Sequence, residues 1–576
     1  MAEPTIQLGG GNWAGKSDNL LGYYKEGERF YKQDFTFSRS TTGTYTDSDG
    51  YIQEMPYNLF TYSNDFSNWG GARLIKTSGK SGYDGTQNGW KIIPTTANNT
   101  HYLAQSISAS GIITISVYAK SGGYDYFTMR DNTSYAKFNL NNGVTSTNGV
   151  GAISSTINLV TDGWYKCTFT YTKSVDGNVV FYINNTYDYV GNFSGDETSG
   201  VYLQDAQLVK GSSAKTYFPT TTRLNMPRVS YKDNSNGSLI LEPQRSNLLN
   251  YSSDFSEWTL ISTVIDTNAV SPTGESNATT ITDNGSGGAS GNVRIQATNF
   301  TITASTQYTF SAYVKANPNS EIKVTTRNDD ALRGGTFDIS TLTFTPEQGT
   351  ETGNVESFGN GFYRIIITWT SGSDTSIGIG IGFPNITRDG TNSFILWGTQ
   401  VEQGSYATTL INTSGSSVTR NADACSLSNV ADRINSSEGT IYGEQKSLET
   451  NFSYNYFASV SDGTNNNRLE IRQSSTGLQF LWRVGGTYQS QITKSNAPFT
   501  SFIKYALRYS STDIKFYVNG SLVGTINSPT LYASGVLNNI EFADGSGNDN
   551  FRGTVKELKY YNTALSDSEL ATLTTL

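Results

Sequence analysis

The sequence contains few of the residues on which enzyme chemistry usually depends. Its 576 residues include one histidine, His101, and two cysteines. A single imidazole leaves little scope for nucleophile–base pairing, and there is no CxxC pair or histidine cluster that could hold a metal ion. His101 follows the polar stretch Asn98-Asn99-Thr100, so we interpret it as a surface or strand-edge histidine. We therefore predict no catalytic residues and a protein that is not an enzyme.

The two cysteines, Cys167 and Cys425, lie in unrelated stretches of the chain. A disulfide between them is allowed, but their spacing does not suggest one. We expect two free thiols, as in a protein made in a reducing cytoplasm.

Charge and long apolar runs are also scarce. Charged residues make up 15% of the chain, and the net charge is −9. An acidic balance disfavours nucleic acid as a partner and gives no reason to expect binding to anionic lipid. No apolar run reaches the roughly 18 residues that a membrane-spanning helix needs. The opening residues, Met1-Ala2-Glu3-Pro4-Thr5, lack the basic and apolar parts of a signal peptide, so we expect no ordinary export and no membrane insertion.

Aromatic residues and glycine, by contrast, are abundant. The chain has 36 tyrosines, 28 phenylalanines and 58 glycines. Tyrosine and phenylalanine favour half-buried pleated surfaces, and glycine supplies tight turns between short strands. This composition predicts β-sandwiches rather than helical bundles.

One all-β module occurs twice in tandem. The stretch from Asn58 to Trp69 has a near-twin from Asn247 to Trp258, about 190 positions later. Three further pairs of blocks follow in the same order: 115–120 with 310–315, 163–166 with 361–364, and 203–212 with 396–405. Within the strand blocks, apolar and polar residues alternate with period two, as a sheet with one buried face requires. Two jelly-roll sandwiches are the most economical architecture.

The remaining regions differ from this module. The C-terminal region contains an alternating strand that ends at Asn519-Gly520, which predicts a hairpin, and Ser566 with Glu569 predicts a capped helix. The N-terminal region is irregular and rich in aromatics. We therefore predict an all-β chain whose parts are an N-terminal docking segment at 1–56, jelly-roll modules at 57–220 and 246–415, linkers at 221–245 and 416–433, and a third sandwich at 434–576.

The repeated blocks resemble a module of bacteriophage tail-fibre and other virion surface proteins. The resemblance rests on the Asn-Leu-Leu opening at 247–249, the Gln-Val-Glu-x-Gly block at 400–404 and the pair Thr419-Arg420. The first copy departs from the pattern at Val209, where glutamate is usual. Residues 434–576 resemble the laminin-G or concanavalin-A-like fold, on Phe516-Tyr517-Val518-Asn519-Gly520, 551–558 and 560–566. The resemblance implies jelly rolls like those of carbohydrate-binding modules, followed by a laminin-G-like sandwich.

Aromatic side chains are the main candidates for ligand binding, because sugars stack on rings while amides and carboxylates bond their hydroxyls. Tryptophans within the repeated framework are better explained as core residues. The candidates outside the repeat are Trp482, Tyr488 and Tyr532. Asp65 and Asp254 recur at equivalent places, and we interpret each as a turn cap rather than as a glycosidase carboxylate.

Two further candidate sites follow from the unrepeated ends. Laminin-G-like domains often bind calcium at the sandwich rim, and this resemblance makes the loop with Asp544, Asn548, Asp549 and Asn550 a possible ligand set, with an ordinary turn as the simpler interpretation. The N-terminal aromatics would be more stable against another protein than in water. We predict virion docking through Trp13, Tyr23, Tyr24, Phe30 and Tyr31.

These observations favour a non-enzymatic bacteriophage fibre or appendage protein that binds host-surface polysaccharide. Assembly in the host cytoplasm, exposure on the virion, contacts with other virion proteins through the N-terminus and a homotrimer follow from the family resemblance. The alternatives are a structural capsid-decorating or tail-assembly protein, a depolymerising tailspike, which the lack of a β-helix repeat disfavours, and a bacterial surface adhesin, which the missing export signal disfavours.

Overall fold

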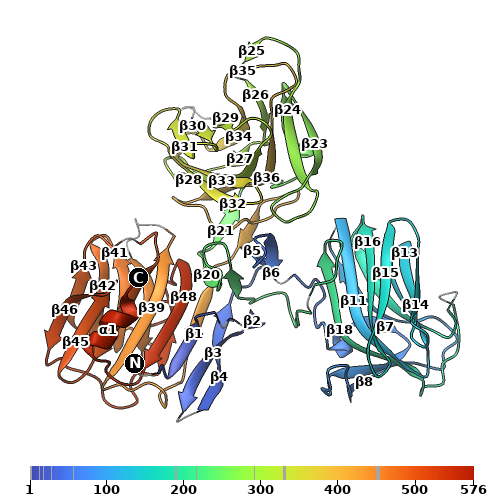
Figure 1. Cartoon of the computed structure of the whole chain (residues 1–576), viewed down its shortest axis with the longest axis horizontal. Coiled ribbons are helices and arrows are strands. Elements are labelled where there is room, and N and C mark those ends of the chain that lie inside the picture. Colours follow the sequence, from blue (N-terminus) through green and yellow to red (C-terminus); the bar gives the residue numbers. More distant parts are fainter. Residues whose placement is uncertain are drawn as a thin grey trace. The chain divides into compact units, whose positions relative to one another are not determined.

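The computed structural model divides the chain into two compact units, residues 55–223 and residues 1–54 with 224–576 (Figure 1). It describes all residues except 1, 2, 12, 14, 17, 18, 27, 28, 56, 110, 188–190, 216, 291, 328–332, 449–453 and 498, and the side chains of 14–34, 289 and 290 are also not described. The predicted all-β class is confirmed. None of the helices in the described part of the chain is long and apolar enough to cross a membrane.

Unit 55–223 contains the first module, built from two six-stranded antiparallel sheets. Their inner faces enclose one buried apolar core. In sheet order the strands of the first sheet are β15 (Ala152–Thr161), β16 (Trp164–Lys173), β11 (Gly111–Gly122), β18 (Gly200–Lys210), β9 (Gly89–Pro94) and β8 (Leu74–Lys80). Those of the second are β14 (Val144–Asn148), β13 (Ser134–Asn139), β12 (Tyr126–Asp131), β17 (Gly177–Asn184), β10 (His101–Ile107) and β7 (Gly70–Ala72).

The second module repeats this topology strand for strand. One sheet runs β23 (Thr263–Ala269), β24 (Ala278–Asp283), β36 (Ser393–Gln403), β28 (Gln307–Ala316), β33 (Phe362–Thr370) and β32 (Thr352–Gly359). The other runs β22 (Thr259–Ile261), β26 (Val293–Gln296), β34 (Ser376–Phe383), β29 (Glu321–Arg327), β30 (Gly334–Asp338) and β31 (Thr343–Pro346), and β27 (Phe300–Thr301) also pairs with β34. The duplication seen in the sequence is therefore also a duplication of sheet order.

The repeated Asn-to-Trp motif has a structural role in both copies. The Asn58 amide donates to the carbonyls of Ala206 and Phe218 and accepts from the N–H of Phe60 and Leu208. Asn247 makes the equivalent four bonds in the second module. Each motif thus fastens the start of its module to the end of the same module.

The aspartates of the motif cap short 3-10 helices. Asp65 accepts from the backbone N–H of Ser67 ahead of η1 (Phe66–Asn68), and Asp254 does the same for η2 (Phe255–Glu257). The following Trp69 and Trp258 are buried, and each indole N–H donates to a backbone carbonyl. The interpretation of these residues as turn caps and core is confirmed.

The C-terminal domain is a closed β structure. One sheet runs β38 (Ala424–Leu427), β47 (Asn539–Glu541), β40 (Tyr454–Ser461), β41 (Arg468–Ser474), β42 (Gly477–Val484) and β43 (Thr487–Lys494). The other runs β46 (Ser521–Asn527), β45 (Asp513–Val518), β44 (Ile503–Tyr509), β39 (Gly439–Ser447) and β48 (Gly553–Tyr561). The hairpin at Asn519-Gly520 forms as predicted, with φ of 47° and 79°, and Ser566 caps helix α1 (Asp567–Thr574) with the predicted capping box.

Strands from the N-terminal residues close this domain, which corrects the expectation of an irregular docking segment. β1 (Ile6–Gly9) pairs with β48 and with β3 (Asn19–Glu26), β3 pairs with β4 (Arg29–Ser38), and β4 pairs with β38. The predicted linker also contains strands, β19 (Arg228–Ser230) and β20 (Ser238–Leu241), and β20 extends the β48 edge. Backbone pairing with a distant edge strand thus gives these short segments the partners that they lack locally. The remaining short strands are β2 (Gly15–Lys16), β5 (Gly43–Thr46), β6 (Ile52–Met55), β21 (Arg245–Asn247), β25 (Ala289–Ser290), β35 (Ile386–Thr387) and β37 (Val418–Arg420).

Candidate functional site

Strand β41 presents charged side chains on the face of its sheet opposite the core. Leu469 and Ile471 point into the core, so the alternating Arg468, Glu470 and Arg472 share the other face. The Arg468 guanidinium donates to Glu470 Oε2, and Arg472 Nη1 lies 3.1 Å from Glu470 Oε1. Burial raises the pKa of the Glu470 carboxyl, against the opposing effect of the two guanidiniums. One buried carboxylate therefore holds two arginines in place.

A second glutamate lies in register with the first. Ser459 of β40 pairs with Glu470 on one side and with Glu541 of β47 on the other, so the three side chains form a row across three strands. Glu541 is buried, and its Oε2 has no hydrogen-bond partner among the described residues. Burial, together with the nearby carboxylate of Asp544, raises the pKa of Glu541 to about 7. Glu541 is thus partly protonated at neutral pH.

An exposed tyrosine lies at one end of this row. The guanidinium of Arg472 lies 4.0 Å from the ring centroid of Tyr454, which is 46% exposed. The neighbouring Tyr456 ring is 6.2 Å from Tyr454, and Arg472 Nε donates to Gln479. We call Tyr454, Ser459, Glu470, Arg472 and Glu541 the polar row. It combines an accessible ring with a fixed guanidinium, an arrangement suited to a ligand that has both apolar and hydrogen-bonding faces.

Sequence reasoning missed the polar row, although a signal was present. The run Arg468-Leu469-Glu470-Ile471-Arg472 alternates charged and apolar residues, which is unusual for a strand whose outer face is otherwise Ser- and Thr-rich. The cross-strand position of Glu541 could not be read from the sequence, because it depends on non-local strand pairing.

The three aromatics predicted to bind glycan have different environments. Trp482 is only 2% exposed, stacks on Phe480 at 5.7 Å and donates to the carbonyl of Thr530. Tyr532 is also buried, and its hydroxyl donates to the carbonyl of Arg468. Both belong to the core, which corrects the expectation that they form a binding surface. Tyr488 of β43 is 47% exposed, opposite Arg483 in the strand register.

The loop predicted as a possible calcium site is held by its own hydrogen bonds. Asp544 Oδ1 accepts from the N–H and hydroxyl of Ser546 and the N–H of Asn548, and its Oδ2 accepts from the Asn465 amide. Asn548 donates to Ser546, and Asp549 is exposed with φ of 49°.

Because donors surround the Asp544 carboxylate, Asp544, Asn548, Asp549 and Asn550 do not fit a calcium ion as they are arranged. Among the described residues, no group of three or more His, Cys, Asp or Glu side chains could hold a metal ion.

Trp13, one of the predicted docking residues, packs within its own chain. Its ring lies against the core of the C-terminal domain, and its indole N–H donates to the carbonyl of Gly237 at 3.0 Å. This contact corrects the expectation that Trp13 is available to another protein. The side chains of the other four predicted residues lie outside those described, and only their strand register is given: Tyr23 and Tyr24 are in β3, and Phe30 and Tyr31 are in β4.

His101 is fully buried, which corrects its interpretation as a surface or strand-edge residue. It begins β10, which lies between β17 and β7. Its Nδ1 lies 2.8 Å from the carbonyl oxygen of Arg73, and its Nε2 lies 2.9 Å from that of Phe193. These contacts give the ring a structural role between two backbone segments. Both cysteines are buried free thiols, as expected.

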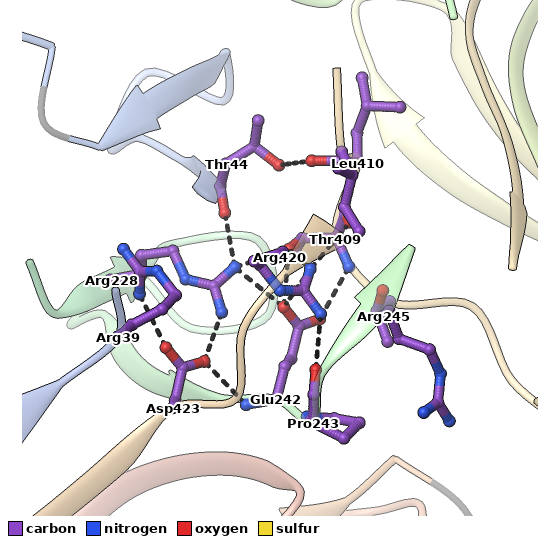
Figure 2. A network of polar contacts seen from close by, with 12 residues as sticks. Arg39, Thr44, Arg228, Glu242, Pro243, Arg245, Thr409, Leu410, Arg420 and Asp423 are labelled. Carbon is purple, nitrogen blue, oxygen red and sulfur yellow. Dashed lines mark hydrogen bonds and ion pairs between the residues drawn. The ribbon is translucent and has the colours of Figure 1, made fainter. Parts of the chain in front are cut away.

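A buried ion network holds the segments around the second module and the C-terminal domain (Figure 2). Asp423 accepts from Arg39 at 2.7 Å and from Arg228 at 2.5 Å. Glu242 lies 2.8 Å from Arg228 and 3.0 Å from Arg420. Burial alone would raise the pKa of Glu242, but Arg420, Arg228 and the donors of Thr409 outweigh it and lower the pKa to about 2. These charges come from β4, both predicted linkers and the second module, so the linkers are structured connections.

Comparison with family models identifies the C-terminal domain. Residues 419–571 match the concanavalin A-like lectin/glucanases superfamily, so they form a concanavalin A-like domain. The match includes every residue of the polar row. A search of curated proteins gives no match.

Comparison with solved structures gives distant similarities. The sialidase carbohydrate-binding module CBM40 of Ruminococcus gnavus, bound to alpha2,3 sialyllactose, is 21% identical over 24% of this chain and 83% of its own, with a TM-score of 0.22. A leech intramolecular trans-sialidase is 21% identical over 24% of each chain, with a TM-score of 0.22. Domain 4 of the arabinanase AbnA from Geobacillus stearothermophilus is 13% identical over 27% of this chain and 73% of its own, also at 0.22. TM-scores this low carry no argument about ligand. The C-terminal domain of this chain is a concanavalin A-like β-sandwich closed by strands from the N-terminal residues.

Proposed function

We propose that this chain is a non-enzymatic bacteriophage appendage protein whose C-terminal domain binds host-surface glycan through the polar row. The observation that carries the proposal is the pairing of the exposed Tyr454 ring with Arg472, which Glu470 fixes from below. A pyranose can stack its C–H face on such a ring while a guanidinium donates to its hydroxyl or carboxylate oxygens.

Two further observations support this function. The concanavalin A-like match names a superfamily of lectins and glucanases and includes the strands that carry the polar row. The repeated Asn-to-Trp module resembles virion surface proteins, which favours exposure on the particle after assembly in the host cytoplasm. Contacts with other virion proteins through the N-terminal residues and association as a homotrimer belong to the same proposal.

The test uses the full chain on an array of host-surface polysaccharides. Wild type is expected to bind at least one of them. Tyr454→Ala is expected to weaken that binding about tenfold, because an aromatic contact of this kind contributes roughly 1–2 kcal/mol. The matched control is Tyr488→Ala, since Tyr488 has almost the same exposure and lies outside the polar row.

Three outcomes would contradict the proposal. A blank array would remove glycan binding, and loss of binding only in Tyr488→Ala would move the site away from the polar row. An image of the intact particle that located the chain inside the tail would favour an assembly role instead.

A further inference from the structure

The same sheet face has different cover in the two modules. In the second module, Tyr313 of β28 is buried in one cluster with Ile52, Phe362 and Trp397. Ile52 belongs to β6, so a segment from the N-terminal region covers this face. In the first module the equivalent of Tyr313 is Tyr118, which is half-buried. The two copies thus share a face but differ in what lies over it.

The contact point of that cover can be traced to one turn. In the second module Ser271 donates to the carbonyl of Glu275, and Ile52 donates to the carbonyl of Pro272 within the same turn. The first module has the same turn, where Gly82 donates to the carbonyl of Thr86. Tyr83 occupies the position of Pro272. The first module therefore has an aromatic side chain where the second receives a strand.

Tyr83 is held flat on the sheet by a carboxylate. Its ring lies parallel to that of Tyr118, with centroids 3.6 Å apart and planes 11° apart, and its hydroxyl donates to Asp205 Oδ2 at 2.9 Å. Asp205 has φ of 55°, and the equivalent residue of the second module is Gly398 with φ of 60°. A left-handed conformation is unfavourable for a residue with a Cβ. The first module thus tolerates backbone strain at the position that orients Tyr83.

Lysines flank these rings. Lys166 Nζ lies 5.9 Å from the Tyr118 ring centroid, and Lys91 Nζ lies 5.5 Å from that of Tyr202 while donating to the carbonyl of Thr198. All four of these side chains are half-buried. In the second module the position of Lys91 is a threonine and that of Tyr202 an isoleucine. The first module therefore carries a cationic aromatic face on a chain whose net charge is −9.

We propose that this face, formed by Tyr83, Lys91, Tyr118, Lys166 and Tyr202, binds an acidic polysaccharide. Its rings can stack on the C–H faces of successive sugars, and its two ammonium groups complement carboxylates along the polymer. The site lies in a different unit from the polar row, and its ligand class is more specific. It does not depend on the C-terminal site being correct.

The experiment measures binding of the full chain to polygalacturonate and polysialic acid, with dextran as the neutral polymer. Wild type is expected to bind at least one acidic polymer and to bind dextran at least tenfold more weakly. The double variant Lys91→Ala/Lys166→Ala is expected to lose about tenfold in affinity for the acidic polymer, and raised salt is expected to weaken wild-type binding. Tyr83→Ala tests the ring contact separately and is expected to lose a similar factor.

The matched control is Lys315→Ala, which removes the lysine 5.8 Å from Phe362 on the covered face of the second module and is expected to bind like wild type. Tyr454→Ala is also expected to keep acidic-polymer binding, so that failure of the polar row and failure of this site give different results. The proposal is overturned if neither acidic polymer binds, if dextran binds equally well, or if both module 1 variants bind like wild type.

Discussion

Removal of Asp423 tests the buried ion network most severely. This carboxylate pairs with Arg39 and Arg228 and accepts from the backbone N–H of Glu242, and all three charged side chains are fully buried. In Asp423→Ala, three buried guanidiniums would face the single carboxylate of Glu242. Loss of one partner from a buried ion pair costs about 3–5 kcal/mol, so we expect the free energy of unfolding of unit 1–54 with 224–576 to fall by about 4 kcal/mol.

The assay is hydrogen exchange in increasing urea, read by mass spectrometry of peptides from each unit. Peptides from 224–576 are expected to unfold at lower urea in Asp423→Ala, whereas peptides from 55–223 serve as an internal reference and are expected to stay unchanged. The control Lys232→Ala breaks a half-exposed ion pair with Glu356 and is expected to cost less than about 1 kcal/mol. Equal stability of Asp423→Ala and wild type would refute the network's role.

Four further outcomes are expected. Because the folded pKa of Glu242 is about 2, below its ordinary 4.5, its contribution of about 3 kcal/mol is present above pH 4.5 and is lost as the pH falls toward 2, which urea titrations at several pH values would measure. Glu541 has the opposite sign, since its folded pKa is about 7: wild type loses stability as the pH rises from 4.5 through 7, and Glu541→Gln is expected to exceed wild type at pH 8 but not at pH 4. A chelator is expected to leave the Tm of the full chain unchanged, because the Asp544 loop is closed by its own donors, and a clear drop would restore a calcium site. Trp482→Ala is expected to lower the free energy of unfolding by roughly 3–5 kcal/mol, with glycan affinity unchanged in the folded fraction.

Features with a local cause were predictable from the sequence. The caps at Asp65 and Asp254, the hairpin at Asn519-Gly520 and the capping box at Ser566 each depend on residues within a few positions of one another. The all-β class and the duplication followed from composition and repeated blocks, which the matching sheet orders now express in three dimensions.

Features with a non-local cause were not predictable in the same way. Ile6 pairs with Tyr560, and the ion network joins Arg39 to Asp423, across almost the whole chain and most of it respectively. Trp482 was misplaced for a related reason: its position outside the repeat indicated nothing about the strands that bury it. Short segments rich in aromatics can pack on their own chain as well as on a partner, and the sequence pattern does not distinguish the two.

The central claim is that the C-terminal domain binds glycan through the polar row. Its most direct test is hydrogen exchange of the full chain with and without a host polysaccharide that binds it. The proposal predicts slower exchange in β40 and β41, the strands that carry Tyr454 and Arg472, and no such protection in Tyr454→Ala. Unchanged exchange in both strands while the glycan is bound would contradict it.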